Sequence, residues 1–307
     1  MNIAIYLIRA VSLITVGVII ANLVLESDAM RKLSPLIRPF CRASNLPKEG
    51  AVALFASFFN STAGKSTLAG FYHEGKIGDK ETILTLVMST FPIVAGESLF
   101  RVHAPIALVL LGPFIGSIYI ALSLLSAFIQ SFAAFVYAKL RFPQCVEEEI
   151  YEYAEKTPKN QQLKTALKKS VSTLKRVLPI MVVAFLVVDF MFTLSVMDNI
   201  SVVFDPVLRV LDLPGAVITA LVADLAHFSA GYAIVAALLA KGVITAKQAI
   251  LTLLIGSMLI ITLVYLKYSL SMYISLFGKL GVKITVINYL SSMVAKVVMI
   301  LLVVVVM

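Results

Sequence analysis

The sequence predicts an all-α integral membrane protein that consists of two inverted-topology repeats. Three observations predict it: an apolar composition, six stretches long enough to cross a bilayer, and one segment that occurs twice. Hydrophobic residues make up 60% of the 307-residue chain, charged residues make up 14%, and the mean hydropathy is +0.98. A soluble domain carries about 25% charged residues. The composition therefore excludes a soluble globular protein, because so few charged side chains cannot cover its surface.

The predicted spans are apolar stretches that match the roughly 20 residues a helix needs to cross the hydrocarbon core. The first is not a signal peptide, because its apolar run is too long, Arg9 interrupts it and no basic segment precedes it. The formal charge of +9 does not indicate nucleic-acid binding, because most basic residues flank the spans and act as topology signals. The spans are 3–25, 81–100, 113–138, 177–197, 247–266 and 284–306.

One segment of the chain occurs twice, which indicates an internal duplication. Residues 46–86 match residues 213–253 without a gap when the chain is shifted by 167 positions. An apolar composition alone does not explain proline, glycine and lysine matched at the same intervals. The matches include Pro47 with Pro214, Gly64 with Gly231, Gly75 with Gly242, Lys80 with Lys247, and Ile83-Leu84-Thr85-Leu86 with Ile250-Leu251-Thr252-Leu253.

The flanks of the matched segment repeat as well, so each copy contains a span, an amphipathic surface stretch, the matched hairpin and two further spans. The amphipathic stretches are 28–44 and 200–212. We therefore expect three parts: membrane repeat 1 at 1–140, a linker at 141–176 and membrane repeat 2 at 177–307.

The matched segment is predicted to be a re-entrant helical hairpin, at 46–73 in the first repeat and 213–241 in the second. As one straight helix, the 28 residues of 46–73 would extend about 42 Å, more than the core thickness of about 30 Å. Its middle, 60–67, reads Asn-Ser-Thr-Ala-Gly-Lys-Ser-Thr. Such residues compete for backbone hydrogen bonds and favour caps and turns, so two half-helices fit better.

Loop charge predicts the orientation of this arrangement. If each hairpin returns to its own side, basic residues concentrate inside, as the positive-inside rule requires. Both termini then face outside and the linker 141–176 is cytoplasmic. The inside loops hold Arg31, Lys32, Arg38, Arg42, Lys48, Lys267, Lys279 and Lys283, and the outside keeps Arg101, Arg209, Lys241 and Lys247.

The polar tip of the first hairpin is the predicted substrate site, in a cavity shared with the second tip. One of its first three polar residues would cap the second half-helix, whose N-terminus and Lys65 would favour an anionic group. Alternatively, Lys65 only forms an ion pair with Glu97 in the second span. Pro92 is expected to kink the helix of that span. The candidates are Asn60, Ser61, Thr62, Lys65, Ser66, Thr67, Glu97 and Ser98, with Ser229 from the second tip.

The second tip supplies predicted ion-coupling residues, because an ionised carboxyl inside a membrane is costly and often functional. Asp224 and His227 are the main candidates, and Asp189 in the fourth span is another. Alternatively, Asp224 lies near the open end of the hairpin and His227 only caps a helix. Weaker candidates are Asn22, Asn288 and Lys296.

Catalytic motifs are not supported, so we expect no enzyme activity, no cofactor and no metal site. Gly64-Lys65-Ser66-Thr67 resembles the end of a phosphate-binding loop, but Phe59 stands where that motif needs its first glycine. Gly96-Glu97-Ser98 fails the nucleophile-elbow pattern, because Phe100 replaces the second glycine.

The order of span, surface helix, re-entrant hairpin and two spans, with its Leu-Pro, Ala-Gly and Gly-x-Ile repeat, resembles the transport core of concentrative nucleoside transporters. It is most similar to stand-alone membrane proteins of the Gate-domain, or nucleoside recognition, family, which includes the membrane part of the ferrous iron transporter. The first tip does not match the Gln/Glu-bearing tip of nucleoside transporters. Cys41 and Cys145 both lie outside the hairpins and spans, unlike the cysteine in the gate of the iron transporter.

The resulting hypothesis is a secondary transporter of a small anionic organic solute, nucleoside-like solutes included, that works by alternating access and couples to protons or sodium. The expected partners are the lipid bilayer and the solute, and a further copy of the chain is an additional candidate partner. The alternatives are a non-transporting membrane scaffold or regulatory protein and a lipid-phosphate carrier on the same fold.

Overall fold

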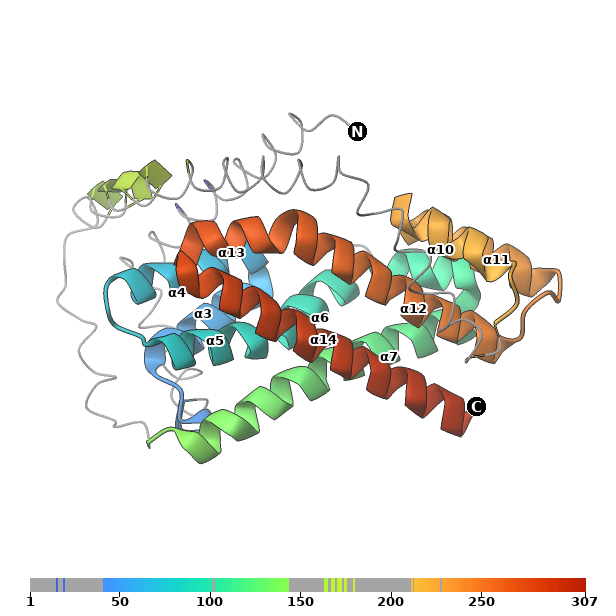
Figure 1. The fold of residues 1–307 in the computed structure, drawn as a ribbon, viewed down its shortest axis with the longest axis horizontal. Coiled ribbons are helices and arrows are strands. Elements are labelled where there is room, and N and C mark those ends of the chain that lie inside the picture. Colours follow the sequence, from blue (N-terminus) through green and yellow to red (C-terminus); the bar gives the residue numbers. More distant parts are fainter. Residues whose placement is uncertain are drawn as a thin grey trace. The chain divides into compact units, whose positions relative to one another are not determined.

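The computed structural model (Figure 1) describes residues 41–100, 103–143, 211, 213–226 and 228–307, with scattered single positions at 15, 19 and between 163 and 179. The described residues form helices and no strand, which confirms the all-α class. Three of the described helices are long and apolar enough to cross a membrane: Ile106–Arg141, Ala246–Phe277 and Lys279–Val306. The predicted spans 3–25 and 177–197, the stretch 200–212 and most of the linker lie outside the described residues.

The first matched segment forms two short helices, α3 (Lys48–Phe59) and α4 (Ser61–His73), rather than one straight helix. Asn60 separates them with an extended backbone (φ −153°, ψ 115°). Its N–H donates to Ala56 O at 3.0 Å, and its side chain accepts from Ala63 N at 3.0 Å. The residue therefore ends one helix and caps the next.

Helices α3 and α4 fold back and pack against each other, and Gly64 makes this close approach possible. A Cβ atom at Gly64 would lie 2.7 Å from both Ala53 O and Ser57 N, and it would collide with the Ser57 hydroxyl. A larger residue at this position would push the two helices apart.

The segment 81–100 is divided into α5 (Asp79–Met88) and α6 (Thr90–Phe100), which corrects the expected single span. The division is at Ser89, before Pro92. A proline cannot donate to the carbonyl four residues earlier and clashes with it. That carbonyl, on Met88, instead accepts from the Ser131 hydroxyl at 2.9 Å.

Helix α7 (His103–Arg141) is interrupted at Gly112, whose backbone (φ 78°, ψ 165°) is not helical. Pro113 follows directly, at the first position of the long part of the helix, where its missing N–H is tolerated. The predicted start of a span at 113 therefore coincides with a real break. Gly116 packs closely against the residues before this break. A Cβ atom placed on Gly116 would lie 2.8 Å from Ala107 O.

The second matched segment forms α10 (Val217–Ala226) and α11 (Phe228–Ala240), followed by α12 (Ala246–Val264). The bounds of α11 lie 167 positions after those of α4, and α12 begins 167 positions after α5. The end of each second helix also repeats. Gly75 and Gly242 have φ of 70° and 69°, the left-handed conformation that commonly ends a helix.

Helix α12 continues through a π-helical turn, η2 (Tyr265–Ser269), into α13 (Leu270–Phe277). The span predicted to end at 266 is therefore too short, and Lys267 lies inside the helix rather than at its end. Gly278, with φ 60°, ends α13, and α14 (Lys279–Val306) follows.

The chain divides into two compact units, each with one broken helix pair and with stretches distant in sequence. Unit 1 contains α3, α4, α5, α13 and the C-terminal part of α7, within Met1–Ile93, Gln130–Phe185 and Leu270–Asn288. Unit 2 contains α10, α11 and α12, within Val94–Ile129, Leu186–Ser269 and Tyr289–Met307. Helices α7 and α14 contribute residues to both units.

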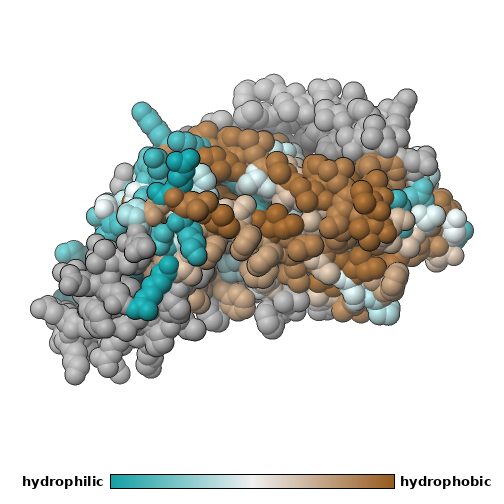
Figure 2. Space-filling view, turned by 90° about the horizontal axis from the view of Figure 1, so that it is seen from below, coloured by the Kyte–Doolittle hydropathy of each residue, from teal (hydrophilic) through white to brown (hydrophobic). Residues whose placement is uncertain are grey.

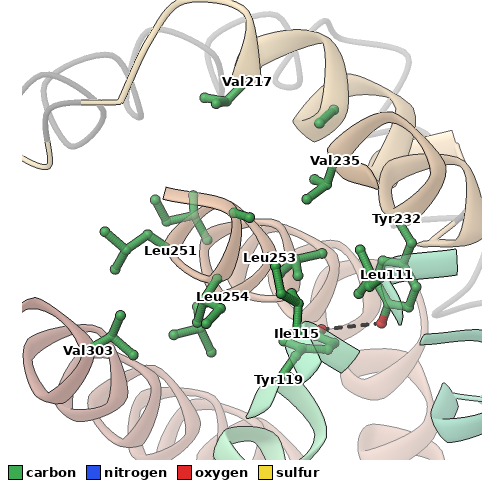
Figure 3. Packing of buried hydrophobic residues seen from close by; sticks show 14 of the residues in the cluster. Leu111, Ile115, Tyr119, Val217, Tyr232, Val235, Leu251, Leu253, Leu254 and Val303 are labelled. Atoms are coloured by element: carbon green, nitrogen blue, oxygen red, sulfur yellow. Dashed lines mark hydrogen bonds between the residues drawn. The ribbon is translucent and has the colours of Figure 1, made fainter. Parts of the chain in front are cut away.

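The core of unit 2 is a cluster of buried apolar residues (Figure 3). It joins α10 and α11 to α12, α7 and α14. Its members include Leu111, Ile115 and Tyr119 of α7, Val217 and Leu221 of α10, Tyr232 and Val235 of α11, Leu251 and Leu254 of α12, and Met299 and Val303 of α14.

Large apolar side chains are also exposed along the long helices, and hydrophobic residues occupy much of the face shown in Figure 2. Val109 and Val305 are 80% and 84% exposed. Exposed apolar patches of this kind mark a membrane or protein contact. Together with the three long apolar helices, they fit a multi-pass membrane protein.

Candidate binding sites at the two helix breaks

The first site begins at Asn60, where the N-terminus of α4 points its backbone N–H groups toward the break. Asn60 provides the cap that the sequence predicts. Ser61 and Thr62, in the first turn, are partly buried. A helix N-terminus with its positive dipole end favours an anionic group.

Lys65 lies on the same helix, one turn further along, against α13. Its Nζ is 5.4 Å from the centroid of the Tyr273 ring, within the range of a cation–π interaction. His73, at the end of α4, donates from Nε2 to Leu276 O at 2.7 Å and so ties α4 to α13. The packing of these two helices therefore fixes where the lysine lies.

Tyr273 connects this lysine to a buried amide pair. Asn288 Nδ2 donates to the Tyr273 hydroxyl at 3.3 Å. Gln130 Nε2 donates to Asn288 Oδ1 at 3.0 Å, although the two residues are 158 positions apart. The result is a polar chain inside unit 1, from Lys65 through Tyr273 to two amides that can both donate and accept hydrogen bonds.

Two hydroxyls next to Lys65 are buried. Ser66 Oγ and Thr67 Oγ1 have no hydrogen-bond partner among the described residues, and the two side chains are 5% and 1% exposed. A buried polar group without a partner costs about 1–3 kcal/mol. A bound solute that supplies a partner would recover this free energy.

The second site centres on Asp224, in the last turn of α10. It lies two residues before the end of this helix and is only 6% exposed. Two glycines make room for its carboxyl group. A Cβ at Gly231 of α11 would collide with Oδ1, and a Cβ at Gly256 of α12 would collide with Oδ2.

A pair of tyrosines adjoins this carboxyl group. Tyr232 of α11 donates its hydroxyl to that of Tyr119 of α7 at 3.3 Å, as Figure 3 shows. Tyr232 directly follows Gly231, the glycine of α11 that faces Asp224 Oδ1. No hydrogen bond joins either described tyrosine to the carboxyl oxygens, and Asp224 Oδ1 has no partner among the described residues.

Several predicted residues are not placed. Asp189 and His227 lie outside the described residues, and the side chains of Glu97 and Ser98 are likewise not described. The proposed Lys65–Glu97 pair therefore stays a prediction. Ser229 lies half-buried in the first turn of α11. Lys296 is buried in α14 at 7% exposure.

Some residues of these sites were not found from the sequence. Tyr273, Gln130, Tyr119 and Tyr232 lie in apolar helices and have no motif around them. Gln130 could have been identified from the sequence, because burying a glutamine within an apolar span costs free energy unless its amide forms a hydrogen bond. Among the described residues, no group of three His, Cys, Asp or Glu side chains is close enough to hold a metal ion.

Comparisons with known proteins identify the family of this chain. The family model described as nucleoside recognition, the Gate domain, matches residues 7–108 and 174–280, and the two matched stretches begin 167 positions apart. No solved structure matches the chain.

Three relatives come from Methanocaldococcus jannaschii, and all three are described as uncharacterized. The chain is 42% identical to protein MJ0880 over 98% of both chains. It is 28% identical to protein MJ0871 over 93% of this chain and 89% of the relative, and 26% identical to protein MJ1556 over 89% and 86%. With more than half of its residues matched by the family model, this chain belongs to the Gate domain, or nucleoside recognition, family of membrane proteins.

Proposed function

We propose that the protein is a secondary transporter of a small anionic organic solute, which binds at the break between α3 and α4. The observation that carries the proposal is the arrangement around Lys65. A cation, a capped helix N-terminus and two buried hydroxyls without described partners lie on consecutive turns of one helix. Each is a group that an anion or its hydroxyls can pair with.

The membrane arrangement belongs to the same proposal. The two helix pairs are re-entrant hairpins in two repeats of inverted topology, with both termini outside and the linker 141–176 in the cytoplasm. Helix ends that recur 167 positions apart support the repeat. The distribution of basic loop residues supports the inversion. Broken helices whose ends point at a solute are a known transporter device, and they give alternating access when one repeat moves against the other.

The amides extend the solute classes that the site fits. Gln130 and Asn288 offer the donors and acceptors that recognise a heterocyclic base or a sugar hydroxyl, and Tyr273 offers a ring to stack on. The proposed solute is therefore anionic with a polar organic part, and nucleoside-like solutes are included. The driving cation, a proton or sodium, is assigned to the second hairpin at Asp224, and the protein has no catalytic role.

Uptake into proteoliposomes tests the proposal. Purified protein is reconstituted with an imposed proton or sodium gradient and given a panel of labelled nucleosides, nucleotides, carboxylates and sugar phosphates. We expect one class to accumulate, and Lys65→Ala to abolish its uptake. Lys80→Ala is the matched control, because Lys80 is exposed outside the site and carries the same charge. If no solute accumulates, or if both variants transport equally, the proposal is wrong.

A further inference from the structure

We propose that Asp224 is a proton-binding site, so that the cation coupled to transport is a proton and not sodium. The coupling part rests on the function proposed above. Proton binding by the carboxyl group stands on the geometry of unit 2 alone. Three observations lead to it: the enclosure of the carboxyl group, the absence of a cationic partner among the described residues, and the absence of a second carboxyl group on α10, α11 and α12.

The carboxyl group of Asp224 is held between two glycine surfaces. Oδ1 faces Gly231 on α11, and Oδ2 faces Gly256 on α12, each so closely that a Cβ atom would not fit. Leu221 packs against the same glycine of α12. Both helices contact α10, so the carboxyl group is enclosed by helix backbone and apolar side chains, with the Tyr119–Tyr232 hydroxyl pair nearby. The glycine surfaces bring only weak Cα–H donors to its oxygens.

No described cation offsets the charge of this carboxyl group. On α11 and α12 the titratable side chains are Tyr232 and Lys247, and α7 contributes Tyr119. Lys247 lies at the start of α12, where its Nζ donates to Val304 O at 2.9 Å. Lys296 is buried in the same unit but makes no ion pair with Asp224. An ionised carboxylate here has lost its hydration without a compensating charge, which is costly.

The surroundings fit a proton better than a metal cation. A hard cation takes about six or more oxygen ligands, usually from several carboxylates and carbonyls. Here α10, α11 and α12 offer one carboxyl group, because none of the three contains another Asp or Glu. A proton needs only that one group. It converts the carboxylate to a neutral carboxyl, which can stay enclosed and can be released when transport exposes it to water.

Carbodiimide labelling tests proton binding without any transport assay. Dicyclohexylcarbodiimide is lipophilic, and a protonated carboxyl group adds to it, giving its proton to nitrogen and its oxygen to the central carbon. The O-acylisourea then rearranges to a stable N-acylurea adduct that peptide mass spectrometry locates. We expect the adduct at Asp224 in the purified protein. Its yield should fall by about tenfold for each pH unit above a single midpoint, because one group titrates. Replacing choline by sodium at constant ionic strength should not change the yield.

Two controls make the result specific. Asp224→Asn should lose the adduct at this peptide, and its elution in size-exclusion chromatography shows whether it stays folded. Asp79 is an exposed carboxylate that accepts from the Tyr72 hydroxyl at 3.0 Å. It should react with a water-soluble carbodiimide and glycine ethyl ester, but not with the lipophilic reagent. If Asp224→Asn does not fold, the pH and sodium series on the unmodified chain decide the question alone.

Other outcomes would overturn the proposal, and they are separable from a failure of the transport function. Sodium that protects Asp224 from labelling would make the site a sodium site. No adduct at any pH would mean that the carboxyl group does not take up a proton. Solute uptake that responds to a sodium gradient but not to a pH gradient would reject proton coupling and leave the transport function intact. Labelling as expected in a protein that moves no solute would reject transport and leave the proton site intact.

Discussion

Asp224 and Ser57 occupy corresponding places in the two helix pairs. They are 167 positions apart, each lies two residues before the end of the first helix of its pair, and each faces a glycine of the second helix, Gly231 or Gly64. Ser57 donates its hydroxyl to Ala53 O at 2.8 Å within its own helix. Asp224 Oδ1 has no partner among the described residues. Equivalent positions of the two helix pairs therefore carry a hydrogen-bonded hydroxyl in unit 1 and, in unit 2, a carboxyl group whose Oδ1 has no partner among the described residues.

Gly64 should be intolerant of a side chain. In Gly64→Ala the new Cβ would press on Ala53 O and Ser57 N, which are backbone atoms that cannot rotate away. Overpacking of this kind costs about 1–3 kcal/mol. We expect a lower thermal-unfolding temperature for the purified protein in detergent.

Gly70→Ala is the matched control for that substitution, because nothing lies within 4 Å of a Cβ at Gly70 in the same helix. An alanine inside a helix is favoured over glycine by up to about 1 kcal/mol. The control should therefore be unchanged or more stable. Equal destabilisation by both variants would contradict the close packing of α3 and α4.

Gly256 and Asp224 should show energetic coupling. Gly256→Ala places a Cβ against Asp224 Oδ2 and should destabilise the protein, whereas Asp224→Ala removes the atom that it strikes. In the double variant, Gly256→Ala should therefore lower the free energy of unfolding by less than it does in the original chain. The difference is an interaction energy of about 0.5–3 kcal/mol. A thermal-unfolding double-mutant cycle measures this, and additive effects would contradict the contact.

Asn60 should contribute through its cap. Asn60→Ala removes the acceptor for Ala63 N, and losing such a cap costs about 1 kcal/mol. Asn60→Asp keeps an acceptor and should restore most of the stability. The same thermal-unfolding measurement serves both variants. If Asn60→Ala is as stable as the original chain, the cap makes no net contribution.

Tyr273 should influence solute affinity through its hydroxyl. Tyr273→Phe keeps the ring under Lys65 but removes the acceptor for Asn288 Nδ2. A neutral hydrogen bond is worth about 0.5–1.5 kcal/mol, so the KM for the transported solute should rise several-fold with the maximal rate little changed. Tyr289→Phe is the control, because its hydroxyl lies 3.0 Å from Thr262 Oγ1, in the other unit. Equal effects of the two variants would count against a role of Tyr273 in the site.

The proposed topology predicts opposite exposure of two matched positions. Lys76 and Val243 follow the glycines that end α4 and α11, and they lie 167 positions apart. After Cys41 and Cys145 are replaced, a cysteine at position 76 should react with an impermeant reagent only from the cytoplasm. A cysteine at position 243 should react only from outside. Labelling of both from one side would overturn the inverted arrangement.

Features that depend on neighbouring residues were determined by the sequence. The break at Asn60 follows from an asparagine before a run of hydroxyl residues, and the ends of α4 and α11 follow from Gly75 and Gly242. These are local backbone preferences, so they are readable in one chain and repeat wherever the local sequence repeats. Apolar composition likewise determined the membrane class.

Tertiary structure decided which polar groups meet. Pro92 predicted a kink, but only the fold brings Ser131 to the carbonyl that the proline leaves free. The pairing of Gln130 with Asn288 joins residues 158 positions apart, and α13 brings Tyr273 to Lys65 from the far end of the chain. Such contacts depend on how helices pack, and no short stretch of sequence encodes a partner that distant. Local backbone preferences determine where the helices break, because they depend only on neighbouring residues. Long-range helix packing determines which side chains meet at each break.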